Sequence, residues 1–260
     1  MRMRTLVAAL FVLAVLPSPA PAQDRPSDGA IYRWNAGRWQ QVEGFGTRIS
    51  VAPDGSPWVV NSRNEIYRWA NGAFTKLPGT ALDIGVGGDG RVWIIGTDSG
   101  VYRWNGNGWD RMEGSGVAIS VDRSGTPWVL NAAGEIYSWN GDRFLVRSGT
   151  ARDVGAADEV WIIGTDGQVY RRGPNEWMPL GGAGERITAG AGGTAWVVNR
   201  AGEIFQWQGG EFRRMPGSAV DIGSNADGQV WIVGTAPRGD QRNRRGNNRS
   251  RAQPDRYLAK

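Results

Sequence analysis

The chain has 260 residues, of which 14 are Trp and 40 are Gly, and it contains neither Cys nor His. Without Cys it can form no disulfide and perform no thiol chemistry, and without His it lacks the commonest general base and metal ligand. The formal net charge of +5 arises at one end, because residues 236–260 alone carry eight basic and two acidic side chains.

Residues 1–22 have the pattern of a secretory signal peptide. Two arginines precede an apolar run at residues 5–16, and Ala20-Pro21-Ala22 supplies small residues for cleavage. This run is shorter than the ~20 residues that a transmembrane helix needs. We therefore predict cleavage after Ala22, a short leader at residues 23–27, and a secreted or periplasmic mature protein without a transmembrane segment. The alternative is an uncleaved anchor.

A repeated phrase occupies residues 28–235. Its marker is a Trp within an apolar run, which recurs every 33 or 35 residues at Trp58, Trp93, Trp128, Trp161, Trp196 and Trp231. Each copy contains four short runs rich in Val, Ile, Tyr and Trp, separated by turns of Gly, Asn and Asp. Such runs are typical of antiparallel strands joined by hairpins, and a fixed period of this length indicates a repeat fold.

The two ends of the repeat region complement each other. The last copy stops after its second strand, at residues 231–235, and the chain opens with the two missing strands, at residues 28–34 and 38–42. The sequence thus predicts an all-β fold, a six-bladed β-propeller of four-stranded antiparallel blades, in which the N-terminal strands complete the C-terminal blade. Tyr32 and Trp231 should then lie in one sheet.

The copies alternate between two types. In N-type copies the marker strand ends in Asn (Asn61, Asn131 and Asn199), and in G-type copies it ends in Gly (Gly96, Gly164 and Gly234). The outermost strand carries Phe in N-type copies and Trp in G-type copies. The innermost strand carries Asp83, Asp153 and Asp221 in G-type copies, against Arg48 and Arg186 in two N-type copies.

These copies resemble tectonin repeats, the units of tectonin and tachylectin-type lectins. The resemblance rests on G-T-A-L-D-I-G-V at residues 79–86, the D-G-R-V-W-I-I run ending at Ile95, and V-Y-R-W-N-G at residues 101–106. It implies a propeller lectin that binds glycans or lipopolysaccharide at several sites. One copy departs from the pattern, because Tyr170-Arg171-Arg172 has lost the Trp of its Tyr-x-Trp motif, which puts any glycan site there in doubt.

A sugar site needs an aromatic face and a few fixed polar groups. On this basis the glycan-binding candidates are the outer-strand tryptophans, the nearby turn asparagines and the strand-end asparagines: Trp39, Trp109, Trp177, Asn35, Asn107, Asn175, Asn61, Asn131 and Asn199. The alternatives are that the tryptophans pack between blades and that the strand-end asparagines only close turns.

No catalytic residue and no cofactor site is predicted, since no nucleophile elbow, phosphate loop or metal-ligand cluster occurs. The three innermost aspartates are weak metal candidates, with ion pairs to Arg48 and Arg186 as the alternative. The favoured function is non-enzymatic carbohydrate binding; the alternatives are an envelope protein-interaction scaffold and, in third place, a propeller hydrolase or lyase.

Residues 236–260 are predicted to form a disordered basic tail. Their charge is suited to contact with polyanions such as anionic glycolipid. It gives little support to nucleic-acid binding, since no aromatic residue interleaves with the basic ones before Tyr257.

Overall fold

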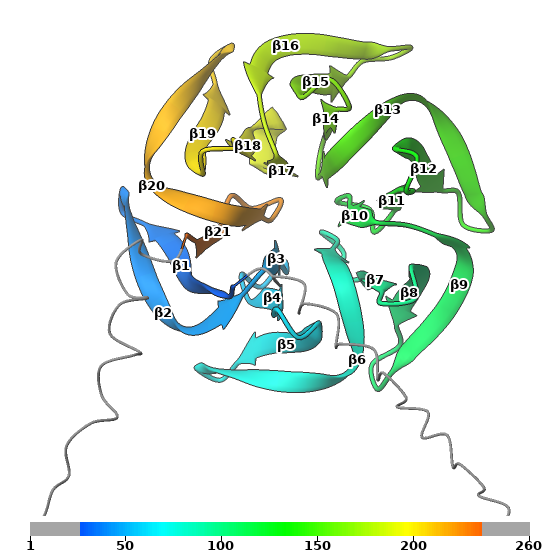
Figure 1. The fold of residues 1–260 in the computed structure, drawn as a ribbon, viewed down its shortest axis with the longest axis vertical. Coiled ribbons are helices and arrows are strands. Elements are labelled where there is room, and N and C mark those ends of the chain that lie inside the picture. Colours follow the sequence, from blue (N-terminus) through cyan, green and yellow to red (C-terminus); the bar gives the residue numbers. More distant parts are fainter. Residues whose placement is uncertain (1–26, 236–260) are drawn as a thin grey trace, which may run out of the picture.

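The computed structural model describes residues 27–235. The predicted signal peptide, most of the leader and the predicted basic tail lie outside these residues. The described chain is almost entirely β-strand, folded into three seven-stranded antiparallel sheets that surround a central axis (Figure 1). No helix among the described residues is long and apolar enough to cross a membrane.

The three sheets follow one another along the chain. Sheet 1 contains β3 (Arg48–Val51), β4 (Pro57–Val60), β5 (Glu65–Ala70), β6 (Ala73–Val86), β7 (Val92–Gly96), β8 (Gly100–Trp104) and β9 (Trp109–Ser115). Sheet 2 contains β10 (Ala118–Val121), β11 (Pro127–Leu130), β12 (Glu135–Trp139), β13 (Phe144–Ala156), β14 (Val160–Gly164), β15 (Gln168–Arg172) and β16 (Trp177–Ala183). Sheet 3 contains β17 (Arg186–Ala189), β18 (Ala195–Val198), β19 (Glu203–Gln208), β20 (Glu211–Ser224), β21 (Val230–Gly234), β1 (Gly29–Asn35) and β2 (Arg38–Gly46), with a 3-10 turn, η1 (Ala191–Gly193), after β17.

One long strand in each sheet belongs to two copies of the repeat. The first part of β6 pairs with β5 and its last part pairs with β7, and β13 and β20 are divided in the same way. The prediction of six separate four-stranded blades is therefore wrong in this detail, because the outermost strand of each N-type copy runs without a break into the innermost strand of the next copy. Each sheet instead consists of an N-type half and a G-type half that share the long strand.

The predicted pairing of the two ends is confirmed. Strand β1 pairs with β21 in antiparallel register, which places Tyr32 opposite Ile232 and Arg33 opposite Trp231. The described chain therefore closes on itself in sheet 3, where the blue and orange ends of the ribbon meet in Figure 1.

Six side chains on the innermost strands connect neighbouring halves around the axis. Each accepts a hydrogen bond from a backbone N–H of the next half. The aspartates Asp83, Asp153 and Asp221 accept from Ile119, Ile187 and Ile49 at 2.8, 2.7 and 2.7 Å. The hydroxyls of Ser50, Ser120 and Thr188 accept from Val86, Ala156 and Ser224 at 3.0, 2.9 and 3.1 Å. The ring is thus fastened at every junction between halves, by Asp and by Ser or Thr in alternation.

The hydrophobic core lies between the halves rather than at one centre. All six marker tryptophans are buried, as the sequence predicts. Apolar residues of one half meet those of the next, as where Trp93 and Ile95 of sheet 1 pack with Ile119 of sheet 2. Both faces of each second strand are therefore covered, which explains why strands such as β7 have no polar side.

Candidate functional site

The outer part of every junction is built from one aromatic side chain lying on one glycine. The glycine is in the long or last strand of one half, and the aromatic residue is on the outermost strand of the next half. The pairs are Gly44 with Phe74, Gly79 with Trp109, Gly114 with Phe144, Gly149 with Trp177, Gly182 with Phe212, and Gly217 with Trp39. All six glycines have positive φ values, between 77° and 141°. Only glycine adopts such a backbone easily and leaves room for the ring.

The tryptophans lie at the three junctions inside the sheets. Trp39, Trp109 and Trp177 donate their indole N–H to the backbone carbonyls of Pro216, Pro78 and Ser148, at 2.7, 2.8 and 2.7 Å. Each ring is half-buried and uses its only polar group within the protein. The structure therefore shows the packing alternative in place at these positions, and a role in glycan binding stays a prediction.

The phenylalanines lie at the three junctions between sheets. A phenyl ring has no hydrogen-bond donor, so it makes no bond across the junction like that of the indole N–H. A cleft of about 550 Å³ opens between sheets 2 and 3, with Val169, Val197, Phe205 and Phe212 as its apolar part. A second cleft, of about 390 Å³, lies at the corresponding place between sheets 1 and 2, where Val101, Val129, Tyr137 and Phe144 occupy the matching positions. We call these two hollows the inter-sheet clefts.

The strand-end asparagines stand at these same junctions. Asn199 lines the first inter-sheet cleft and Asn131 lines the second. Each carboxamide oxygen accepts backbone N–H groups two and four residues later, and each Nδ2 donates to the following Glu. The asparagines thus close their own turns, as the alternative interpretation holds, and also present a polar rim above an apolar floor.

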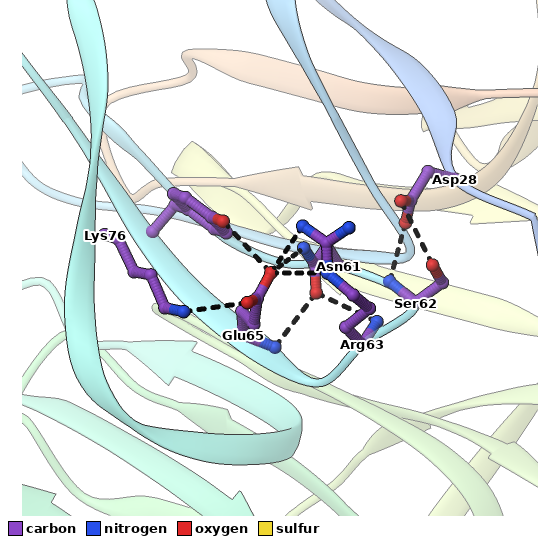
Figure 2. Close-up of polar contacts among 7 residues, drawn as sticks. Asp28, Asn61, Ser62, Arg63, Glu65 and Lys76 are labelled. Atoms are coloured by element: carbon purple, nitrogen blue, oxygen red, sulfur yellow. Dashed lines mark hydrogen bonds and ion pairs between the residues drawn. The ribbon is translucent and has the colours of Figure 1, made fainter.

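The third junction, between sheets 3 and 1, carries a polar network around Glu65 and Asp28 (Figure 2). Glu65 accepts from Lys76 Nζ at 2.7 Å, from Asn61 Nδ2 at 2.7 Å and from Arg63 Nε at 2.9 Å. These donors, Lys76 foremost, hold the pKa of Glu65 far below its usual range. The Asp28 carboxylate accepts from the backbone N–H of Ser62 at 2.6 Å and from its hydroxyl at 3.1 Å.

The turn asparagines are exposed and separated from one another. Asn35 donates to Gln40 at 3.1 Å, the backbone N–H of Asn107 donates to the side chain of Asn105 at 3.0 Å, and Asn175 lines a small groove beside Trp177. They therefore lie at the hairpins of the Trp junctions and do not join the strand-end asparagines in one site.

The innermost aspartates form a partly neutralised cluster near the axis. Arg186 lies 3.7 Å from Asp153 and 3.8 Å from Asp221, and Arg48 lies 3.8 Å from Asp83. Burial raises the pKa of Asp153 to about 7 and that of Asp221 to about 6, against the attraction of the arginines. The predicted ion-pair alternative is thus present. Within residues 27–235 no group of three or more His, Cys, Asp or Glu is placed to hold a metal ion.

Sequence reasoning did not find the inter-sheet clefts, although the alternation of Phe and Trp on the outermost strands marks them. A phenyl ring and an indole ring fill similar positions, but only the indole donates a hydrogen bond across the junction. The copies with Phe were visible in the sequence, and two of them, those of Phe144 and Phe212, border the inter-sheet clefts.

Comparison with known proteins agrees with this architecture. A family model for the tectonin domain matches residues 25–93, 80–152 and 148–256. Tectonin-2 of Physarum polycephalum is 49% identical over 35 residues, which are 14% of this chain and only about a tenth (10%) of that relative.

A solved propeller structure is similar in fold at low identity. The crystal structure of the WD40 beta propeller domain of Doa1 aligns with a TM-score of 0.58 at 12% identity, over 80% of this chain and 83% of that one. The structure of YCF48 bound to a D1 peptide aligns with a TM-score of 0.45 at 15% identity, over 77% and 75%. Together with the repeats and the closed ring of sheets, the family match shows that this chain belongs to the tectonin domain family.

Proposed function

We propose that this protein is a non-enzymatic carbohydrate-binding propeller that takes glycans at its inter-sheet clefts. The observation that carries the proposal is the recurrence of one hollow at equivalent junctions, with Phe and Val on its floor and Asn at its rim. An aromatic ring suits the C–H face of a sugar, and fixed amide and carboxylate groups suit its hydroxyls. Repetition on a rigid ring favours multivalent binding to a glycan-coated surface such as lipopolysaccharide.

Further parts of the proposal concern organisation and location. Each half of a sheet corresponds to one copy of the repeat. The protein is secreted or periplasmic after cleavage behind Ala22, and residues 236–260 add contact with polyanions. N-terminal sequencing of the protein recovered outside the cytoplasm tests whether the chain is cleaved behind Ala22. A recovered protein that still begins at Met1 would exclude this cleavage.

A glycan array that includes lipopolysaccharides, probed with the full-length protein, tests the function. The matched variant is Ala201→Arg, which copies Arg63 of the third junction onto the rim of the larger cleft, beside Glu203. We expect this variant to fold and to bind less glycan, since the new side chain narrows that cleft. Ala73→Arg, at an exposed hairpin, serves as the control with the same added charge. Absence of binding to every glycan would overturn the proposal.

One observation favours the second candidate, a protein-interaction scaffold. The residues that precede the innermost strands include three exposed aliphatic side chains, Leu82, Val117 and Val220, which are 37%, 46% and 41% exposed. Apolar side chains of this kind, repeated at one position of the ring, suit a protein partner better than a sugar. Glycan-independent binding of a purified envelope protein, weakened by Leu82→Ser and Val117→Ser, would support the scaffold.

A further inference from the structure

One of the three Trp junctions differs from the other two at a pair of positions. In sheets 1 and 3 the space beside the marker tryptophan is filled by Leu77 with Trp104 and by Met215 with Trp34. In sheet 2 the equivalent positions carry Arg147 and Arg172. Two apolar residues that pack at one place in the fold have therefore both been replaced by arginine.

The two arginines gather over one ring. The guanidinium carbon of Arg172 lies 4.8 Å from the centroid of Trp128, and that of Arg147 lies 6.0 Å from it. Arg147 also donates from Nε to the hydroxyl of Ser138 at 2.8 Å, and Ser138 is buried, with 2% of its surface exposed. The equivalents of Ser138 are the larger Arg68 and Gln206, so this small residue makes room for Arg147.

The charge of this pair is not balanced. Within residues 27–235 no carboxylate lies within 4.0 Å of the guanidinium nitrogens of Arg147 or Arg172, whereas thirteen ion pairs of other arginines occur there. Burial and the nearby Arg147 lower the pKa of Arg172. Two like charges near a buried aromatic ring destabilise each other. In the other two sheets the same place is filled by one aliphatic or thioether side chain and one Trp.

A groove of about 210 Å³ opens beside the two arginines. Its walls include Trp177, whose indole N–H is held by the Ser148 carbonyl at 2.7 Å, and the hairpin at residues 173–176. Among the described residues that line the groove, only Glu176 has a carboxylate; it is exposed and has no ion-pair partner within 4.0 Å in residues 27–235. The groove therefore combines a fixed aromatic wall with two cationic forks.

We propose that this groove, formed by Arg147, Arg172 and Trp177, binds an oxyanion group, a carboxylate, sulfate or phosphate, carried by a sugar. Guanidinium forks donate paired hydrogen bonds that match the oxygens of such groups. The ligand restores the missing negative charge, and its ring lies against Trp177. The sugar part rests on the proposed function, whereas the oxyanion part depends only on the groove.

The double variant Arg147→Leu/Arg172→Trp tests the proposal by giving sheet 2 the pair of sheet 1, Leu77 with Trp104. We expect this variant to fold, since sheet 1 already folds with this pair and sheet 3 with Met and Trp, and to be more stable than the wild type without ligand. Circular dichroism checks the fold, and the single variant Arg172→Trp replaces it if the double variant does not fold. Arg38→Gln, at an exposed hairpin of another Trp junction, is the control for loss of one positive charge.

The probes are inorganic phosphate and sulfate, then glucuronate against glucose, titrated calorimetrically into the full-length proteins. All variants keep the same basic residues 236–260, so anion binding there is common to all. We expect the double variant to bind phosphate and glucuronate about 10- to 100-fold more weakly than the wild type, the usual effect of losing charged hydrogen bonds. Arg38→Gln should match the wild type.

The outcomes separate this inference from the proposed function. Equal anion affinity in the wild type and the double variant overturns the anion site, and leaves carbohydrate binding at the inter-sheet clefts untouched. If the wild type binds phosphate, the double variant does not, and no glycan on the array is bound, the anion site is supported and the proposed carbohydrate binding is overturned. If the wild type binds glucuronate, the double variant does not, and neither protein binds glucose, the full proposal is supported.

Discussion

Replacing Asp153 by Asn tests how burial acts on the carboxylates at the central axis. Asp153 is 7% exposed, accepts the backbone N–H of Ile187 at 2.7 Å, and shares Arg186 with Asp221. Three aspartates thus face two arginines, and the third N-type position holds Ala118. Asparagine keeps an oxygen that can accept from Ile187 and removes the titrating charge.

The sign follows from the proton balance. Burial raises the pKa of Asp153 from 3.8 to about 7, so the folded state holds a proton that the unfolded state has lost. The stability due to this group is fully present below pH 4 and is lost as pH rises through 7. From pH 5 to pH 8 the contribution of Asp153 to the free energy of unfolding should fall by at most about 2.7 kcal/mol, since about two pH units separate pH 5 from its pKa.

Urea denaturation followed by tryptophan fluorescence at pH 5, 6, 7 and 8 measures the effect. We expect the wild type to lose stability across this range and Asp153→Asn to lose distinctly less, so that the variant gains on the wild type towards pH 8. Asp142→Asn, at an exposed hairpin, should behave like the wild type. A wild type that becomes more stable towards pH 8, or a variant with the same pH dependence as the wild type, would refute the reasoning.

Three further predictions concern the junctions and the closure. Gly79→Ala should destabilise the fold by roughly 1–3 kcal/mol, because the residue has a φ of 86° and the Cβ of alanine would lie 2.9 Å from the Trp109 ring. Gly106→Ala, at a residue with a φ of 100° and open space around it, should lower the free energy of unfolding by less, and equal urea midpoints for the two variants would contradict this packing argument. Trp109→Phe should cost about 1 kcal/mol or more through its lost hydrogen bond and lost ring area, and calorimetry that finds no change would contradict the role of its 2.8 Å contact with Pro78. Deletion of residues 27–46 exposes the edge of β21 and should yield oligomers in size-exclusion chromatography; a stable monomer would show that the closing pair is dispensable.

Much of the architecture could be predicted because each copy repeats the same local signals. The spacing of the marker tryptophans, the turn sequences and the split last copy led to a closed ring of antiparallel strands, and the pairing of β1 with β21 confirms the joint. The long strands could not be foreseen. Gly79, Gly149 and Gly217 look like turn residues, yet a positive φ here only bends the strand, and the chain continues to the next half without a break.

The candidate site was predictable in part. Asn131 and Asn199 were named from repetition alone, and they do line hollows. The outer tryptophans were predicted to bind glycans, but a large side chain with one hydrogen-bond donor is equally suited to pack between two halves and bond across their junction. Arg172 stood out in the sequence because it replaces the Trp of the Tyr-x-Trp motif. Arg147 did not stand out, because the equivalent residues Leu77 and Met215 become neighbours of that motif only in the folded sheet.

The joint between β1 and β21 also determines how the ring responds to force. Gly29, at the start of β1, packs against Gly234, at the end of β21, so the two ends of the described chain lie at the same end of the antiparallel pair. A force that pulls these two ends apart would break the hydrogen bonds between β1 and β21 one after another, rather than loading all of them at once in shear. A protein tethered at one end to a surface and pulled at the other would therefore open first at its own seam, while the remaining sheets stay folded.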